Sequence, residues 1–399
     1  MNRYCFIFLI FFLALKITAA PDEWLFERSY KDSRLFLHAF INYSFDLDED
    51  YEWEKYRLSR NGTRFAAGSV STNDLLINGQ LMVNQDLGNG WYFLNRLHYH
   101  ATRHYHTEEK TVLLGLEKTI YKHYSTFILI QPSFDKEYTD IRFGVSSTDQ
   151  NREKYMRIAL VLDDPLYDHK TKLGSETTQY PVGIHWLFRV EKNNWCIFSE
   201  GKWTTGHKRR YIKPELSPVI RFHQQQINHM TIKLYYRFQN GSLLQFSAEH
   251  YDFLESHRYY QAENNYRFSD QLTHGAVKYL MRIHPNSHLI LQAHGVWMNA
   301  ESCGYRAHDF SRLDMMPAAF YKFFTGKNTL IFGYFHSQFE WEYLSRAGIR
   351  NYNKQGLTEK LLIGWSWQFN KQANIQISLS HETELNNFGG GSIRYRIFF

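Results

Sequence analysis

The pattern of hydrophobic and polar positions along this chain predicts β-strands. Across residues 230–238, 277–283, 360–369 and 374–380, apolar residues occupy alternate positions, and polar residues fill most of the places between them. Side chains two residues apart on a strand share a face, so each segment would present one apolar face and one largely polar face. From about residue 75 onward the chain divides into such segments, each roughly nine to twelve residues long.

The length of these segments separates two architectures that both show alternation. Strands of soluble proteins cluster near about 5 or 6 residues, whereas a strand that crosses a bilayer needs about 9 to 11. The segments match the longer class, and beyond the N-terminus no apolar run approaches the roughly 20 residues of a spanning helix. The sequence therefore predicts an all-β fold, a transmembrane antiparallel β-barrel of roughly 18 strands, with 16 to 20 compatible because residues 34–75 are hard to divide.

The connections between the segments alternate in length, as expected for short periplasmic turns and longer extracellular loops. Tight turns are predicted at Glu191–Asn194, His284–Ser287, Thr325–Asn328 and Asn370–Gln372. Long connections are predicted around residues 101–110, 164–179, 299–315 and 342–356. If the C-terminus is periplasmic, counting backwards places all four turns on the periplasmic side. The tight Asn-Gly turn at Gln239–Ser242 is the exception, because this count assigns it to the outside.

The first residues have the three-part layout of a secretory signal peptide. Arg3 precedes the apolar run Phe6–Leu15, and the small residues Ala19 and Ala20 follow it. A run of about ten residues is too short to span a membrane as a helix, so an uncleaved anchor is the weaker interpretation. We expect residues 1–20 to be a signal peptide, residues 21–33 a periplasmic lead-in, and residues 34–399 a single barrel domain.

Composition agrees with strands and excludes one class of partner. Aromatic residues make up 17% of the chain, and only 8 residues are proline, a bias that suits pleated surfaces and interfacial girdles. Loss of Arg3 and Lys16 with the signal peptide would leave 44 basic and 40 acidic residues, a formal net charge of +4. That small excess argues against a nucleic-acid binder. Cys196 and Cys303 match no metal or haem motif, and whether they pair is open.

The end of the chain carries the most specific signal. Phe399 is the last residue, and Ile393, Tyr395 and Ile397 would lie on the same side of the final strand. This ending resembles the C-terminal signature of Gram-negative outer-membrane β-barrel proteins, a class that includes porins and other channels. In that class the assembly machinery recognises such a strand, whose open edge is available for pairing. The resemblance implies export through the periplasm to the outer membrane, with its lipid and the barrel-assembly machinery as partners.

Assigning the apolar face of each strand to lipid leaves a basic set of residues facing inward. The predicted inward bases are Arg96, Arg157, Arg189, Lys202, Lys233, Arg237, Lys278, Arg282, Lys360, Arg394 and Arg396. The predicted inward acids on the same strands are Glu117, Glu200 and Glu249. A basic lumen would favour anions such as phosphate, carboxylated sugars or acidic polysaccharide. The alternative is that these bases only pair with acids or face water.

Four histidines form the pattern His-Tyr-His-x-x-x-His-Tyr-His near residue 100. His98 and His100, like His104 and His106, are two residues apart, so each pair could direct two imidazoles toward one metal ion. No carboxylate or cysteine completes an obvious ligand set before Glu108 and Glu109. Solvated histidines at the rim of the barrel are the simpler interpretation, and no cofactor is expected.

The sequence contains none of the common catalytic motifs, so we do not expect an enzyme, although rim sites of outer-membrane enzymes need no local motif. The first functional hypothesis is a porin-type channel, water-filled, with a basic lumen that favours anions. An export conduit for acidic polysaccharide is the alternative within transport. A structural barrel or adhesin that seats a partner protein is the alternative outside it, and an open lumen would distinguish transport from that role.

Overall fold

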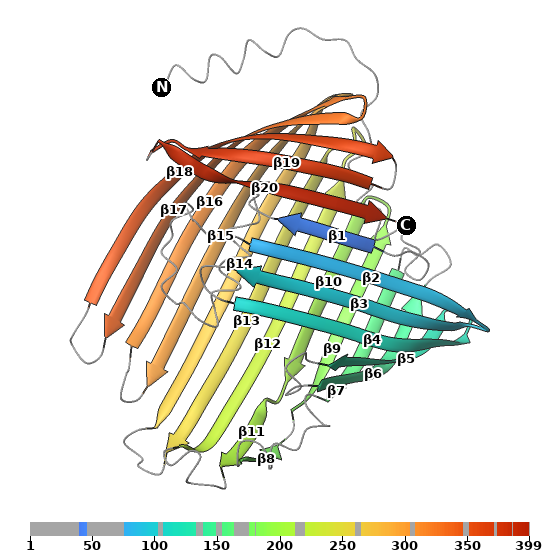
Figure 1. Ribbon diagram of the computed structural model, residues 1–399, viewed down its shortest axis with the longest axis vertical. Coiled ribbons are helices and arrows are strands. Elements are labelled where there is room, and N and C mark those ends of the chain that lie inside the picture. The colour runs from blue at the N-terminus through green and yellow to red at the C-terminus, as the bar shows by residue number, and fades with distance from the viewer. Residues whose placement is uncertain are drawn as a thin grey trace.

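The computed structural model of the protein describes residues 40–45, 76–102, 107–132, 139–148, 154–162, 175–179, 181–211, 220–259, 265–303, 308–345, 351–370, 373–384 and 386–398. Nearly all of these residues lie in the strands of one curved sheet (Figure 1). The expected signal peptide, the lead-in and Phe399 lie outside the described residues. Among those described, no helix is long and apolar enough to cross a membrane.

Within the described residues the sheet contains 20 strands, which vary in length. They are β1 (Phe40–Phe45), β2 (Leu76–Gly88), β3 (Trp91–Thr102), β4 (Thr107–Tyr121), β5 (Tyr124–Pro132), β6 (Thr139–Thr148), β7 (Lys154–Leu162), β8 (Ser175–Gln179), β9 (Val182–Lys192), β10 (Trp195–Thr204), β11 (His207–Tyr211), β12 (Ile220–Arg237), β13 (Leu243–Tyr259), β14 (Tyr266–His284), β15 (Ser287–Cys303), β16 (His308–Thr325), β17 (Asn328–Ser345), β18 (Asn351–Asn370), β19 (Ala373–Glu382) and β20 (Asn387–Phe398).

Every pairing among these strands is antiparallel, which confirms the predicted all-β antiparallel fold. Strands adjacent in sequence are neighbours in the sheet, except that β7 pairs with β9 and β10 with β12. The short strands β8 and β11 pair with each other and lengthen the β9–β10 hairpin. β1 lies between β2 and the last strand, β20 (Figure 1). Its Phe40 pairs with Met82 of β2 and with Phe398 of β20.

The tight turns gather where the strands end on one side of the sheet. This rim is hereafter called the turn edge, and the rim at the opposite ends of the strands is called the loop edge. Asn89, Asn193, Gly241 and Gly326 adopt positive φ at these turns, as two-residue hairpins require. The Asn240–Gly241 turn joins β12 to β13 on the same edge as the others, so the assignment of Gln239–Ser242 to the outside was wrong. The count failed there because β13 and β14 are each one long strand, so that an even number of strands separates this turn from the turn at His284–Ser287.

Strand length also departs from the expected nine to twelve residues. β12 to β18 contain 17 to 20 residues each, whereas β5, β6, β7 and β10 contain 9 or 10. Two predicted long loops are largely strand. β15 continues to Cys303 before β16 begins at His308, and β17 continues to Ser345 before β18 begins at Asn351.

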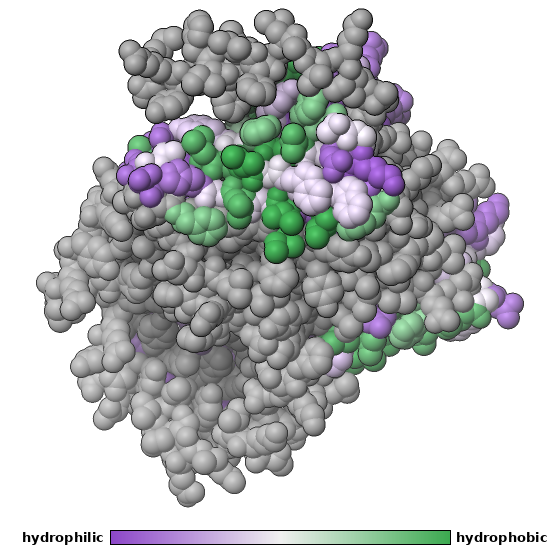
Figure 2. All heavy atoms as spheres, turned by 45° about the horizontal axis from the view of Figure 1, so that its top comes forward, coloured by the Kyte–Doolittle hydropathy of each residue, from purple (hydrophilic) through white to green (hydrophobic). Residues whose placement is uncertain are grey.

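The two faces of the sheet differ in exposure. One face, here the outer face, carries large apolar side chains that are exposed at alternate positions, such as Ile128 at 45% and Ile363 at 64%. Figure 2 shows one such band of apolar side chains with hydrophilic side chains at its two ends. On β9 the outer-face Trp186 lies over Gly201 of β10, where a Cβ would meet its ring, and its indole N–H donates to Ser199 at 3.1 Å.

The opposite, inner face carries the polar residues and the buried apolar clusters. In β13 to β17 the larger cluster includes Leu272, Ile290, Val296 and Phe320, each exposed by 3% or less. A smaller cluster in the N-terminal strands contains Leu94, Phe127, Leu129 and Ala159. The inner face, predicted to be largely polar, therefore also carries buried apolar clusters.

Candidate channel wall on the inner face

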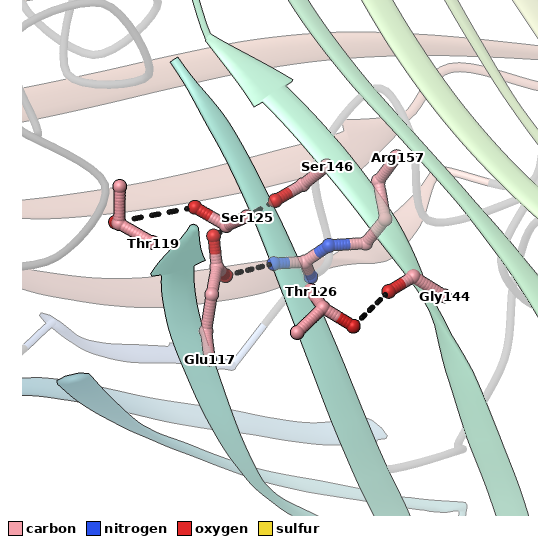
Figure 3. Close-up of polar contacts among 7 residues, drawn as sticks. All are labelled: Glu117, Thr119, Ser125, Thr126, Gly144, Ser146 and Arg157. Carbon is pink, nitrogen blue, oxygen red and sulfur yellow. Dashed lines mark hydrogen bonds and ion pairs between the residues drawn. The ribbon is translucent and has the colours of Figure 1, made fainter. Parts of the chain in front are cut away.

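In the N-terminal strands the predicted inward base Arg157 is part of an ion-paired network (Figure 3). Its guanidinium lies 3.0 Å from the carboxylate of Glu117, which is only 3% exposed. Ser146 donates a hydrogen bond to the other carboxylate oxygen at 2.8 Å. The guanidinium carbon also lies 4.6 Å from the ring centroid of Phe127, within cation–π range. Residues of β4, β5 and β6 therefore hold the Arg157 side chain in place, and the carboxylate of Glu117 neutralises its charge.

Two other predicted bases on this side of the molecule are paired in the same way. Lys202 on β10 contacts Asp140 on β6 at 3.1 Å, and Arg189 contacts Glu191 on its own strand at 3.2 Å. The predicted acid Glu200 lies 3.5 Å from His185. Sequence reasoning missed Asp140 and Glu191, although the parity of β6 and β9 places both on the inner face.

In the C-terminal strands the inner-face bases form rows across the sheet instead. Cross-strand register joins Lys278 through Gln292, Ala318 and Phe335 to Lys360. Residues directly opposite one another share a face, so Lys278 and Lys360 belong to one row.

A second row lies closer to the turn edge. His288 pairs with Arg282 on one side and with Lys322 on the other. Lys322 was missed because it stands between Tyr321 and Phe323, where alternation does not identify the polar face. Arg282 is exposed at this edge, while Lys360 is 7% exposed. Arg237 and Lys233 on β12 extend the basic positions to the neighbouring strand.

Two acids of this wall, Glu249 and Asp314, lie in a different row, farther from the turn edge, whereas Glu382 of β19 stands directly opposite Lys360. Glu249 pairs with His274, and His274 continues through Val296 to Asp314. Glu249 accepts a hydrogen bond from Thr231 at 3.3 Å and lies 4.0 Å from His274. His274 in turn stacks on His294, with 3.0 Å between Nε2 and Nδ1. Apart from Lys360 and Glu382, the basic and acidic positions of these strands therefore lie at different levels along the sheet.

Several predicted residues fall where the structure does not describe side chains. They are Arg96, His98, His100, Arg394, Tyr395, Arg396 and Ile397, while His104, His106 and Phe399 lie wholly outside the described residues. Ile393 is described, and its side chain is 49% exposed. Within the described residues no group of three or more histidine, cysteine or acidic side chains is placed to hold a metal.

The two cysteines lie on separate parts of the sheet. Cys196 is on β10 and takes part in no disulfide. Cys303 ends β15, with β12, β13 and β14 between the two strands. The question of pairing left open by the sequence is therefore answered for Cys196.

Comparison with known proteins gives matches of shape alone. No family model and no curated protein matches the chain. A bacterial polysaccharide outer membrane secretin covers 91% of this chain and 98% of its own, with 10% identity and a TM-score of 0.37. OmpT of Vibrio cholerae, an outer membrane protein in its trimer form, covers 91% and 97%, with 9% identity and a TM-score of 0.37. The outer membrane channel DcaP of Acinetobacter baumannii covers 91% and 95%, with 11% identity and a TM-score of 0.33. The structural neighbours of this chain are outer-membrane β-barrel proteins.

Proposed function

We propose that this protein is an outer-membrane channel of the porin type, with an anion-favouring section formed by its C-terminal strands. The observation that carries the proposal is that the same strands have an apolar outer face and a basic inner face. The outer face exposes apolar side chains such as Ile363 and Val277, which suit lipid. The inner face of the same strands carries the rows of Lys278 with Lys360 and of Arg282 with Lys322.

The barrel itself is part of the proposal. Pairing of β1 with both β2 and β20 supports closure of the sheet, and closure removes the open edges that lipid cannot satisfy. If β8 and β11 are extensions of the β9–β10 hairpin, the ring contains about 18 spanning strands. The turn edge would face the periplasm and the loop edge the cell exterior of a Gram-negative bacterium.

The expected charge of the lumen depends on how the inner-face bases and acids are placed. Three N-terminal bases have carboxylates within 3.2 Å, so they add little net field. In the C-terminal strands Gln292, Ala318 and Phe335 stand between Lys278 and Lys360 in one row, and the acid Glu382 follows beyond Lys360. Salt screens exposed charges over a Debye length of about 8 Å at physiological ionic strength, but a charge at a constriction acts on the ion directly.

The test is the reversal potential of the purified protein in planar bilayers under a salt gradient. We expect anion preference in the native protein and a marked loss of it in the variant R237Q/K278Q/R282Q. The control K122Q/K192Q/K327Q removes three exposed charges at the turn edge and should keep the preference. Cation preference in the native protein would overturn the anion channel. Current blocked by an acidic polymer, with small anions excluded, would favour polysaccharide export.

A second candidate, a structural barrel that seats a partner, is favoured by one observation. The inner-face cluster around Leu272, Ile290 and Phe320 is apolar and almost fully covered, and a water-filled lumen needs no such cluster. This candidate predicts no conductance in the same bilayer experiment. That the protein is not an enzyme, and that the assembly machinery recognises its final strand, remain predictions.

A further inference from the structure

The strands β12 to β16 continue well beyond the apolar band on the outer face. The last apolar row toward the loop edge pairs Met230 with His250, Thr273, Trp297 and Leu313 in succession. Met230, Trp297 and Leu313 are each at least 40% exposed. Aromatic and apolar side chains of this kind mark the boundary of the lipid region. Whatever lies farther along these strands on the outer face is above that boundary.

The next outer-face row consists of hydrogen-bonding side chains. Its members, paired in register, are Asn228, Asp252, Gln271, Asn299 and Ser311. An unbroken row of amide, carboxylate and hydroxyl groups on an outer surface suits sugar hydroxyls better than acyl chains. This row is therefore polar over five strands, and in the row beyond it Leu254 is the apolar residue between Gln226 and Ser269.

Two further rows carry exposed cations. Gln224 pairs with Lys208 on β11 and with Ser256 on β13, and Ser256 pairs with Arg267 on β14. In the row beyond it, Phe222 pairs with both Arg210 and Arg258. Register thus places all four cations on the outer face, away from the inner-face bases. Each of the four side chains is exposed; they are hereafter the outer basic patch.

Specific contacts hold β11 in the position that completes this patch. The chain bends between β10 and β11 at Gly206, whose φ is +77°. The side chain of Asn228 accepts from the backbone N–H of Thr204 at 2.9 Å, and that of Gln226 donates to the Thr204 carbonyl at 2.7 Å. These outer-face amides replace ladder bonds at the bend. β8 and β11 lie at the lower end of the view in Figure 1, on the loop edge.

The height of the outer basic patch above the apolar band indicates the size of lipid headgroup that would reach it. Gln224 lies six residues beyond Met230 on β12, which is about 20 Å along the strand. For strands tilted by about 40° this becomes roughly 15 Å of height. That distance exceeds the depth of a simple glycerol phosphate headgroup and matches an oligosaccharide headgroup that extends from the membrane.

Arginine supplies the preferred donors for phosphate because its guanidinium binds two oxygens at once, and three of the four cations are arginines. Four acidic positions share this surface: Asp252 lies in the polar row, Glu301 pairs with Asp309 in the next row, and Glu176 of β8 pairs with Arg210. The two rows that carry the four cations contain one of these acids, Glu176, so positive charge predominates in those two rows.

We propose that the outer basic patch, with the polar row beneath it, binds the phosphorylated oligosaccharide headgroup of outer-leaflet lipid. The inference rests on the proposed membrane position of the sheet and not on its conductance. Binding there would fix the protein laterally in the outer leaflet while leaving the inner face untouched.

The test measures binding of purified lipopolysaccharide to the full protein in detergent by native mass spectrometry. The variant R210Q/R258Q/R267Q should bind at least tenfold more weakly and with a shallower salt dependence. The control K122Q/K192Q/K327Q loses three exposed cations at the turn edge and should bind as the native protein does. Lipopolysaccharide with a dephosphorylated core and unchanged acyl chains should bind the native protein as weakly as intact lipid binds the variant.

Three results would overturn the proposal. Equal binding by variant and control would remove the patch as the site, and indifference to core phosphates would remove the headgroup as the ligand. Arginine-dependent binding of millimolar inorganic phosphate in place of the lipid would assign a free phosphate site instead. Channel conductance is measured on the same variants. An unchanged reversal potential beside weakened lipid binding separates this proposal from the proposed function.

Discussion

Strands β4 to β10, the N-terminal wall, and strands β12 to β18, the C-terminal wall, differ in how their inner-face charges are arranged. In β4 to β10 the strands are short, and inner-face bases meet acids on neighbouring strands, as Arg157 meets Glu117 and Lys202 meets Asp140. In β12 to β18 the strands are about twice the length that spanning requires, and most inner-face bases and acids lie in separate rows, with Lys360 opposite Glu382 of β19 as the exception. The first wall is therefore marked by close ion pairs, and the second by basic and acidic positions at different levels.

The largest effect is expected from breaking a pair in the N-terminal wall. E117Q leaves Arg157, whose side chain is 15% exposed, without its carboxylate partner, and should lower the free energy of unfolding by about 3 kcal/mol. The double variant E117Q/R157Q should recover most of this loss. Urea unfolding in lipid vesicles measures both. A cost below about 1 kcal/mol for E117Q would mean that water solvates the pair and that this wall is not compact.

The next effect tests whether the long strands leave the membrane. V277R places a charge inside the apolar band and should cost about 2 to 4 kcal/mol, whereas Q271R on the same face of β14 should cost about 1 or less. I128R, in the short strand β5, should resemble V277R. Equal costs for V277R and Q271R in the same unfolding measurement would show that the band extends along the whole of β14.

A third prediction compares the walls by selectivity. K278Q/K360Q removes one basic row and should lower the ratio of anion to cation permeability about twofold. E117Q/R157Q removes a base and an acid together and should leave the ratio unchanged. Reversal potentials in planar bilayers report both variants. A larger change in the E117Q/R157Q variant would place the selective section in the N-terminal wall.

The smallest effect concerns hydrogen bonds that both walls share on the outer face. The indole N–H of Trp186 donates to Ser199, and that of Trp365 donates to Asn328 at 3.0 Å. W186F and W365F should each cost about 1 kcal/mol, because one hydrogen bond is lost while the aromatic surface is kept. Thermal unfolding measures both. A far larger cost for W186F would show that its packing over Gly201 depends on that bond.

Alternation was sufficient to predict antiparallel strands, because each strand has one exposed face and one covered face, and this difference is visible in its own sequence. Strand ends were missed where the outer face becomes polar: Gln226 and Gln271 look like loop residues in sequence but pair in register. The ion pairs were beyond sequence reasoning. Glu117 and Arg157 are 40 residues apart, and only the order of β4 to β7 in the sheet brings them together. Lys322 shows a further limit, because apolar residues on both faces hide the parity of its strand.

The pairing of β1 with β20 has a consequence for the order of folding. Every hairpin can form from residues close in sequence, but Phe40 meets Phe398 across almost the whole chain. Closing so long a loop costs roughly 4 kcal/mol more chain entropy than closing a tight turn. That contact must therefore be among the last to form. Until it does, the edge of β20 that β1 later covers is open to pairing with other chains.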